Sequence, residues 1–128
     1  MRDEQVRRYS RHIMLPDIGG LGQTAIMVSS AKLVLRESEP TAEIVAGSYL
    51  AAGGIGKLVV PQSSDDQRAA IASRGPDTQV VAEGDGREVA LAPRPAWWPS
   101  TDGDAVALAY YRGSVAAAAF LSDVVSRS

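Results

Sequence analysis

The sequence of 128 residues contains no cysteine and a single histidine, His12. The lack of cysteine excludes disulfides, thiolate nucleophiles and cysteine-ligated zinc within this chain. A metal site built from several histidines of one chain is excluded as well, whereas Mg²⁺ on carboxylates is not. We expect His12 to be a structural hydrogen-bonding residue.

The sequence also has little excess of charge of either sign, since the net charge is only −2. This balance argues against nucleic acid or an anionic membrane surface as a partner. No uninterrupted apolar run approaches the ~20 residues that a membrane span needs. Residues 1–12 have no apolar core of the secretory type. We therefore expect a cytoplasmic protein that binds neither nucleic acid nor membrane.

The hydrophobic pattern predicts a single α/β domain with a modest core. Residues 31–35 and 57–61 are typical of short buried strands. The segment 37–54 between them predicts a helix with Ser38 or Glu39 as its cap, Pro40 in its first turn, and two glycines as its end, Gly53 and Gly54. Such a strand, helix, strand unit makes the two strands parallel.

In front of this Rossmann-like core, 31–128, we expect an N-terminal helical arm over residues 1–30. A helix is predicted over 1–14, and Pro16 ends it. The glycine-rich "DIGGLG" that follows predicts a loop, and the remaining residues of the arm predict a second short helix.

After the second strand, residues 63–75 predict a helix capped by Ser63 or Ser64. Residues 78–83 and 87–93 predict two further strands, which together with the first two make a short, mostly parallel sheet flanked by helices.

The apolar, Ala-rich segment 105–125 has two interpretations. The one we favour is a strand at 105–110 followed by a helix from about Ser114. On such a strand, Tyr110 and Tyr111 would point to opposite faces. The other is a single helix over 104–125, with Gly113 as a weak point.

The stretch "RYSRHIMLPDIGGLGQ", residues 8–23, resembles the N-terminal signature of the ThiF/MoeB/HesA family, the bacterial relatives of ubiquitin-activating E1 enzymes. The likeness continues in "SYLAAGGIGKLVV", residues 48–60, and more weakly in "GSVAAAAFLSDVV", residues 113–125. The resemblance implies a dimer with a Rossmann-like sheet that adenylates the C-terminal glycine of a ubiquitin-like protein with ATP and Mg²⁺. The family's middle segment, with its Mg²⁺-binding Asp and zinc-ligating cysteines, is missing, so the resemblance implies a minimal, truncated E1-like fold.

The chain departs from the family where ATP would bind. There, a glycine-rich loop after the first strand cradles phosphates at a helix N-terminus. The aligned stretch here is "RESEP", residues 36–40, which has no glycine. Pro40 removes an amide donor, and Glu37 and Glu39 put negative charges where the family puts phosphate oxygens.

The second strand ends in Pro61 and Gln62 instead of the acid that holds a ribose in such sites. Asp65 and Asp66 follow a few residues later. We interpret them as structural residues in the first turn of the next helix, where a negative charge is favourable, and ribose binding is the alternative.

The resemblance implies that Arg11 reaches across the dimer to the partner's ATP. The interpretation we favour is that Arg8 and Arg11, with Tyr9 between them, contact a partner through interface or surface ion pairs. Trp97 and Trp98 lie in a Pro-rich loop. They either cover the core, which we favour, or form an exposed anchor for a partner.

The leading hypothesis is a non-catalytic E1-like pseudoenzyme without a cofactor, which dimerises and binds partners. The partner would be a second copy, an active E1-like subunit, or a ubiquitin-like or sulfur-carrier protein. The alternative is a diverged ATP-dependent adenylyltransferase of such carriers that still binds nucleotide or another small ligand. A third hypothesis is a small structural module of a larger assembly.

Overall fold

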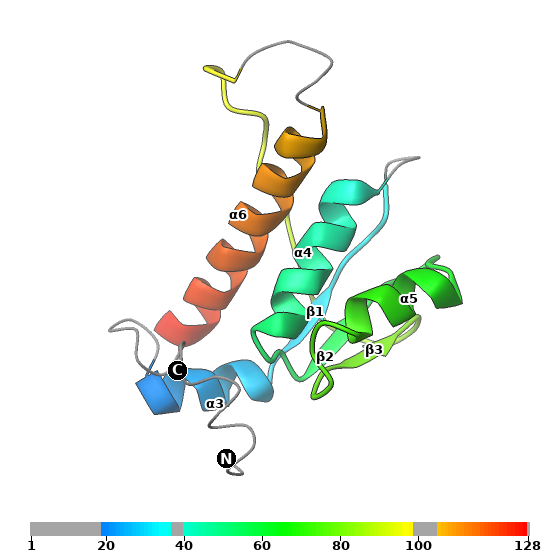
Figure 1. Ribbon diagram of the computed structural model, residues 1–128. Coiled ribbons are helices and arrows are strands. Elements are labelled where there is room, and N and C mark those ends of the chain that lie inside the picture. The colour runs from blue at the N-terminus through cyan, green and yellow to red at the C-terminus, as the bar shows by residue number, and fades with distance from the viewer. Residues whose placement is uncertain (1–18, 37–39, 99–104, 128) are drawn as a thin grey trace.

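The computed structural model describes residues 19–36, 40–98 and 105–127 (Figure 1). In these ranges the elements are α3 (Gly19–Met27), β1 (Ser30–Lys32), α4 (Thr41–Ala52), β2 (Lys57–Val59), α5 (Asp65–Ala72), β3 (Gln79–Val81), β4 (Arg87–Glu88) and α6 (Ala105–Ser126). The helix predicted over 1–14 and the predicted caps Ser38 and Glu39 lie outside the described residues.

The four strands form one sheet in the order β3-β2-β1-β4, and every neighbouring pair is parallel. Ala31 of β1 lies opposite Leu58 of β2, which in turn lies opposite Val80 of β3. The predicted parallel unit of strand, helix and strand is therefore confirmed, and the fold is a mixed α/β fold with a small parallel sheet.

Helices α4 and α5 cover the same face of this sheet. The chain steps from β1 to β2 to β3 in one direction, and right-handed crossovers then place both helices on one side. Figure 1 shows α6 beside α4, which lies between α6 and α5. Leu58 faces this layer, since it lies next to Gly47 of α4.

The connection between β3 and β4, residues 82–86, contains no helix and crosses the other face. Gly84, with a φ of +142°, lies beside Lys57 and Val59, whose side chains point away from the helices because they alternate with Leu58. Gly86 lies so close to β1 that a Cβ atom would come 2.8 Å from the carbonyl oxygen of Ala31. The five residues 82–86 thus carry the chain across the sheet, from β3 at one edge to β4 beside β1 at the other.

The core lies between the sheet and the helix layer. Its largest fully buried side chains come from every layer and include Ile26, Leu33, Leu50, Ile55, Leu58 and Ile71. Two of the buried polar side chains have partners here: the Gln23 amide donates to the Gly53 carbonyl at 2.9 Å, and the Thr78 hydroxyl donates to the Ile55 carbonyl at 2.7 Å.

The residues predicted to begin and end helices α4 and α5 are confirmed in part. Ser64 caps α5 in a capping box with Gln67, and Gly53 ends α4, as predicted. Pro40 does not lie in the first turn of α4 but is its N-cap residue, and it makes no side-chain hydrogen bond there. The first turn of α4 consequently depends on other residues.

Three predicted elements are wrong in type or extent. The strand predicted at 105–110 is helical, because α6 runs unbroken from Ala105 to Ser126, and the single-helix interpretation is confirmed. Alanine has the highest helix propensity, and α4 offers a packing surface to the helix. The loop predicted at 17–22 is helical from Gly19 on, and the fourth strand is only Arg87–Glu88.

Helix α6 is also the one element among the described residues that is long and apolar enough to span a membrane. Length and composition alone are weak evidence, since a helix that packs on a protein core passes the same test. Only four of its 22 residues are buried, and none of them lies in its first two turns: Gly113, Ala116, Ala117 and Phe120. The other residues of this apolar helix are at least partly exposed, and this exposure needs an explanation.

Candidate functional site

A cavity of about 290 Å³ lies at the carboxyl ends of β1 and β4. In parallel α/β sheets, ligands bind in a crevice at this edge, where the connections from two neighbouring strands diverge. The chain leaves β1 toward β2, whereas β4 lies on the other side of β1. The residues that line the cavity include Leu33, Arg36, Glu43, Glu88, Val89, Leu91 and Arg112.

Glu43 is the unusual member of this set. It lies in the first turn of α4 and is only 1% exposed. Neither of its carboxylate oxygens accepts a hydrogen bond. A charge in the first turn gains about 0.3 to 1 kcal/mol from the helix dipole. Burial of a polar group without a partner costs about 1 to 3 kcal/mol. The larger of these two effects is the unfavourable one.

Neither of the two arginines that line the cavity donates a hydrogen bond to this carboxylate. Arg36 Nη2 lies 2.5 Å from Glu88 Oε1, and both side chains are exposed. Arg112 Nε donates to the carbonyl oxygen of Ala92 at 2.9 Å, and it makes a further interaction. The arginines therefore have partners, and Glu43 has none.

Sequence reasoning missed Glu43 and singled out Glu37 and Glu39, which lie outside the described residues. A signal was present in the sequence. Glu43 precedes the buried residues Ala46 and Leu50 by three and seven positions, so helical periodicity places it on the apolar face of α4. An acidic residue on such a face is worth attention because charged residues are rarely fully buried without a partner.

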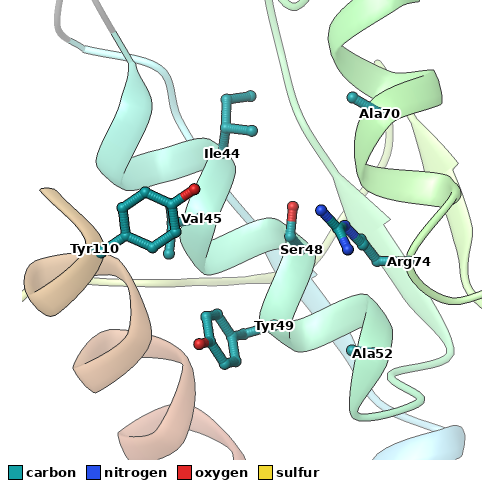
Figure 2. A pocket seen from close by; sticks show the side chains of 8 residues that line it. All are labelled: Ile44, Val45, Ser48, Tyr49, Ala52, Ala70, Arg74 and Tyr110. Carbon is teal, nitrogen blue, oxygen red and sulfur yellow. The ribbon is translucent and has the colours of Figure 1, made fainter. Parts of the chain in front are cut away.

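A second hollow lies between α4, α5 and α6 on the outside of the helix layer. This groove has a volume of about 380 Å³. Figure 2 shows Tyr49 and Tyr110 on one side of it and Arg74 on the other, with Ile44 and Ser48 of α4 between. Tyr49 is 52% exposed and Tyr110 is 54% exposed. Large aromatic surface is therefore available to a partner here.

The two tryptophans form an aromatic cluster with Tyr111 of α6. The ring centroid of Tyr111 lies 6.2 Å from Trp97 and 5.5 Å from Trp98. Trp97 is 72% exposed, so the expectation that it covers the core is wrong, and Trp98 is only partly buried. Consecutive helical residues point about 100° apart, which is why Tyr110 reaches the groove and Tyr111 reaches the tryptophans.

The remaining predicted site residues divide into two groups. Arg8, Tyr9, Arg11 and His12 lie outside the described residues. Asp65 and Asp66 lie in the first turn of α5, and Asp65 pairs with Arg68, so they have the structural place predicted for them. Across the described ranges, no group of three or more His, Asp or Glu residues is placed to hold a metal ion.

Comparison with known proteins adds no family to this description. No family model matches the chain, and no curated protein matches it. The likeness to ThiF, MoeB and HesA consequently rests on the quoted sequence motifs, and what it implies enters below as a proposal.

Proposed function

We propose that this protein is a non-catalytic, E1-like pseudoenzyme of the ThiF/MoeB/HesA type that dimerises and binds a protein partner. The proposal combines the sequence motifs of residues 8–23 and 48–60 with a parallel sheet whose first crossover helix is α4. It assigns the chain a binding role in the cytoplasm in place of adenylation.

The observation that carries the proposal is the buried carboxylate of Glu43. A phosphate-binding site of this fold class offers unpaired amides and a positive helix end to an anion. Here the first turn of α4 already holds a negative charge that is shielded from water. At a separation of ~4 Å, two like charges repel by about 1 kcal/mol in water and by about 4 kcal/mol near a protein surface. A triphosphate at this helix end would meet that repulsion.

The exposed aromatic surface supports the binding role. The groove between α4, α5 and α6 presents Tyr49 and Tyr110, and aromatic residues dominate the energetics of protein interfaces. We assign this groove to a second copy of the chain. A net charge of −2 gives two copies little mutual repulsion, and the neighbouring half of α6 is mostly unburied.

Isothermal titration calorimetry with Mg-ATP tests the absence of a nucleotide site. We expect no saturable heat, because the carboxylate of Glu43 in the first turn of α4 would repel the phosphates. A thermal-shift scan with the same ligand serves as a second readout, since any ligand that binds the folded state raises stability by mass action. A micromolar Kd, about −8 kcal/mol, would overturn the proposal in favour of a diverged adenylyltransferase.

A further inference from the structure

The cavity at the carboxyl ends of β1 and β4 contains an acceptor that nothing in the protein satisfies. Both oxygens of Glu43 lack a hydrogen-bond donor, and the residue is 1% exposed. Native proteins pair almost all of their buried polar groups, and an exception of this kind calls for an explanation. A ligand that brings the missing donors is one explanation, and it is independent of the partner-binding role proposed above.

The surroundings of Glu43 define what such a ligand must look like. Leu33, Val89 and Leu91 give the cavity apolar walls. Arg36 pairs with Glu88 and Arg112 donates to the Ala92 carbonyl, so Glu43 is the charged residue of this lining whose side chain has no hydrogen-bond partner. A ligand with a positive, donor-rich head and an apolar stem complements all of these features.

Other ligand classes fit the cavity less well. A divalent metal ion takes six or more oxygen ligands or several nitrogen and oxygen ligands, and one carboxylate cannot provide them. An anionic ligand would bring a like charge to Glu43. The volume of about 290 Å³ lies at the lower end of small-molecule sites, which span about 300 to 1,000 Å³. The occupant is therefore small.

We propose that this cavity is a binding site for a small aliphatic cation of the guanidinium or ammonium type, with Glu43 as its counter-charge. A guanidinium presents parallel N–H donors that match both oxygens of one carboxylate, whereas an ammonium offers a point charge. The site prefers the guanidinium for that reason. Its stem lies against the walls formed by Leu33, Val89 and Leu91.

Methyl NMR titration of the full chain tests the site directly. The probes are butylguanidinium, butylammonium, neutral butanol and anionic butyrate, and the readout is the methyl shifts of Leu33, Val89 and Leu91. We expect saturable shifts with both cations, tighter for butylguanidinium, and none with butyrate. The substitution Glu43→Gln keeps the shape and removes the charge, and it should weaken cation binding by at least about tenfold.

Glu83→Gln is the matched control, since it removes the same charge from an exposed position outside the cavity. It should leave the affinity unchanged within about twofold. If Glu43→Gln does not fold, Glu43→Met replaces it as the charge-removing variant. The proposal fails if neither cation gives saturable shifts, if the Glu43 variants bind as the wild type does, or if butanol or butyrate binds as tightly as the cations.

One further experiment distinguishes an arginine side chain of another protein from a free small molecule as the natural source of the guanidinium. A capped Gly-Arg-Gly peptide carries the guanidinium on a protein-like backbone. Binding of this peptide with the affinity of butylguanidinium identifies an arginine side chain as the natural occupant. Weaker binding by at least about tenfold identifies a free small molecule. Both results support the cation site, because each requires that butylguanidinium bind.

Discussion

Gly113 of α6 lies directly against Ala42 of α4. A Cβ atom at Gly113 would come 2.4 Å from the Ala42 carbonyl oxygen and 2.9 Å from the Ala46 amide nitrogen. Gly113, which the sequence suggests as a weak point in a long helix, is therefore a place where the two helices are in close contact. The groove that Figure 2 shows depends on this approach, since α4 and α6 form two of its sides.

We expect Gly113→Ala to destabilise the protein. Alanine improves helix propensity by about 1 kcal/mol, but overpacking costs about 1 to 3 kcal/mol, and here the contact is with backbone that has little room to move. The net loss should be up to roughly 2 kcal/mol in the free energy of unfolding, measured by urea denaturation, because a clash with backbone lies at the costly end of the overpacking range. Ser122→Ala, on the exposed side of α6, is the control and should change it by less than about 0.5 kcal/mol. A stabilised Gly113→Ala variant would show that α6 does not pack on α4 in this way.

Glu43→Met should raise the free energy of unfolding of the protein without ligand by about 1 to 3 kcal/mol. Methionine has a similar volume and removes two buried oxygens that accept no hydrogen bond. Chemical denaturation of both proteins measures the difference. The same change at the exposed Glu83 is the control and should have little effect. A loss of stability in Glu43→Met would mean that the carboxylate has a stabilising partner.

The carboxyl of Asp123 should titrate below its ordinary pKa of 3.8. The main cause is the hydrogen bond from Arg87, and Arg127 contributes less. A lowered pKa in the folded state stabilises the fold above the unfolded-state value of 3.8, and this contribution disappears as the pH falls through the lowered pKa. Carbon-detected NMR titration should show that Arg87→Gln raises the pKa of Asp123 toward 3.8 and that Arg127→Gln raises it less. Equal pKa values in wild type and Arg87→Gln would contradict this ion pair.

If the groove binds a second copy, Tyr49→Ala and Tyr110→Ala should each weaken the dimer. The loss of an interface aromatic of this kind costs about 1 to 2 kcal/mol, or roughly a tenfold rise in the dimer dissociation constant. Sedimentation velocity over a dilution series measures that constant. Val28→Ala removes an exposed apolar side chain outside the groove and should leave the dimer unchanged. A wild-type protein that stays monomeric at tens of micromolar, roughly −6 kcal/mol, would refute the dimer.

Ser64→Ala should lower stability by about 1 kcal/mol. The Ser64 hydroxyl accepts a hydrogen bond from the Gln67 amide at 3.1 Å, and the Gln67 side chain accepts one from the Ser64 amide at 2.9 Å. The substitution leaves the Gln67 amide without that acceptor. Ser73→Ala at the other end of α5 is the control, because the Ser73 hydroxyl only donates to a carbonyl already within the helix end. Similar effects at both serines would argue against the capping box.

Much of the fold follows from local sequence. The apolar runs near Ala31, Leu58 and Val80 predict three of the four strands, because a short apolar run between turn residues fits a buried strand. Gly53 predicts the end of α4, and the pattern around Ser64 predicts the start of α5. These signals act within a few residues of where they occur, so they need no knowledge of the rest of the chain.

Tertiary structure decided what depends on distant segments. The sequence around 105–110 is compatible with strand or helix, and α4 as a packing partner selects the helix. The connection 82–86 gives no local sign that it carries β4 across the sheet to β1. Glu43 lies on an apolar helix face by its spacing alone, but its isolation from donors arises only because β4 and α6 close the cavity around it. Periodicity fixes which way a side chain points, whereas its partners are set by residues that are brought near it only when the whole chain packs.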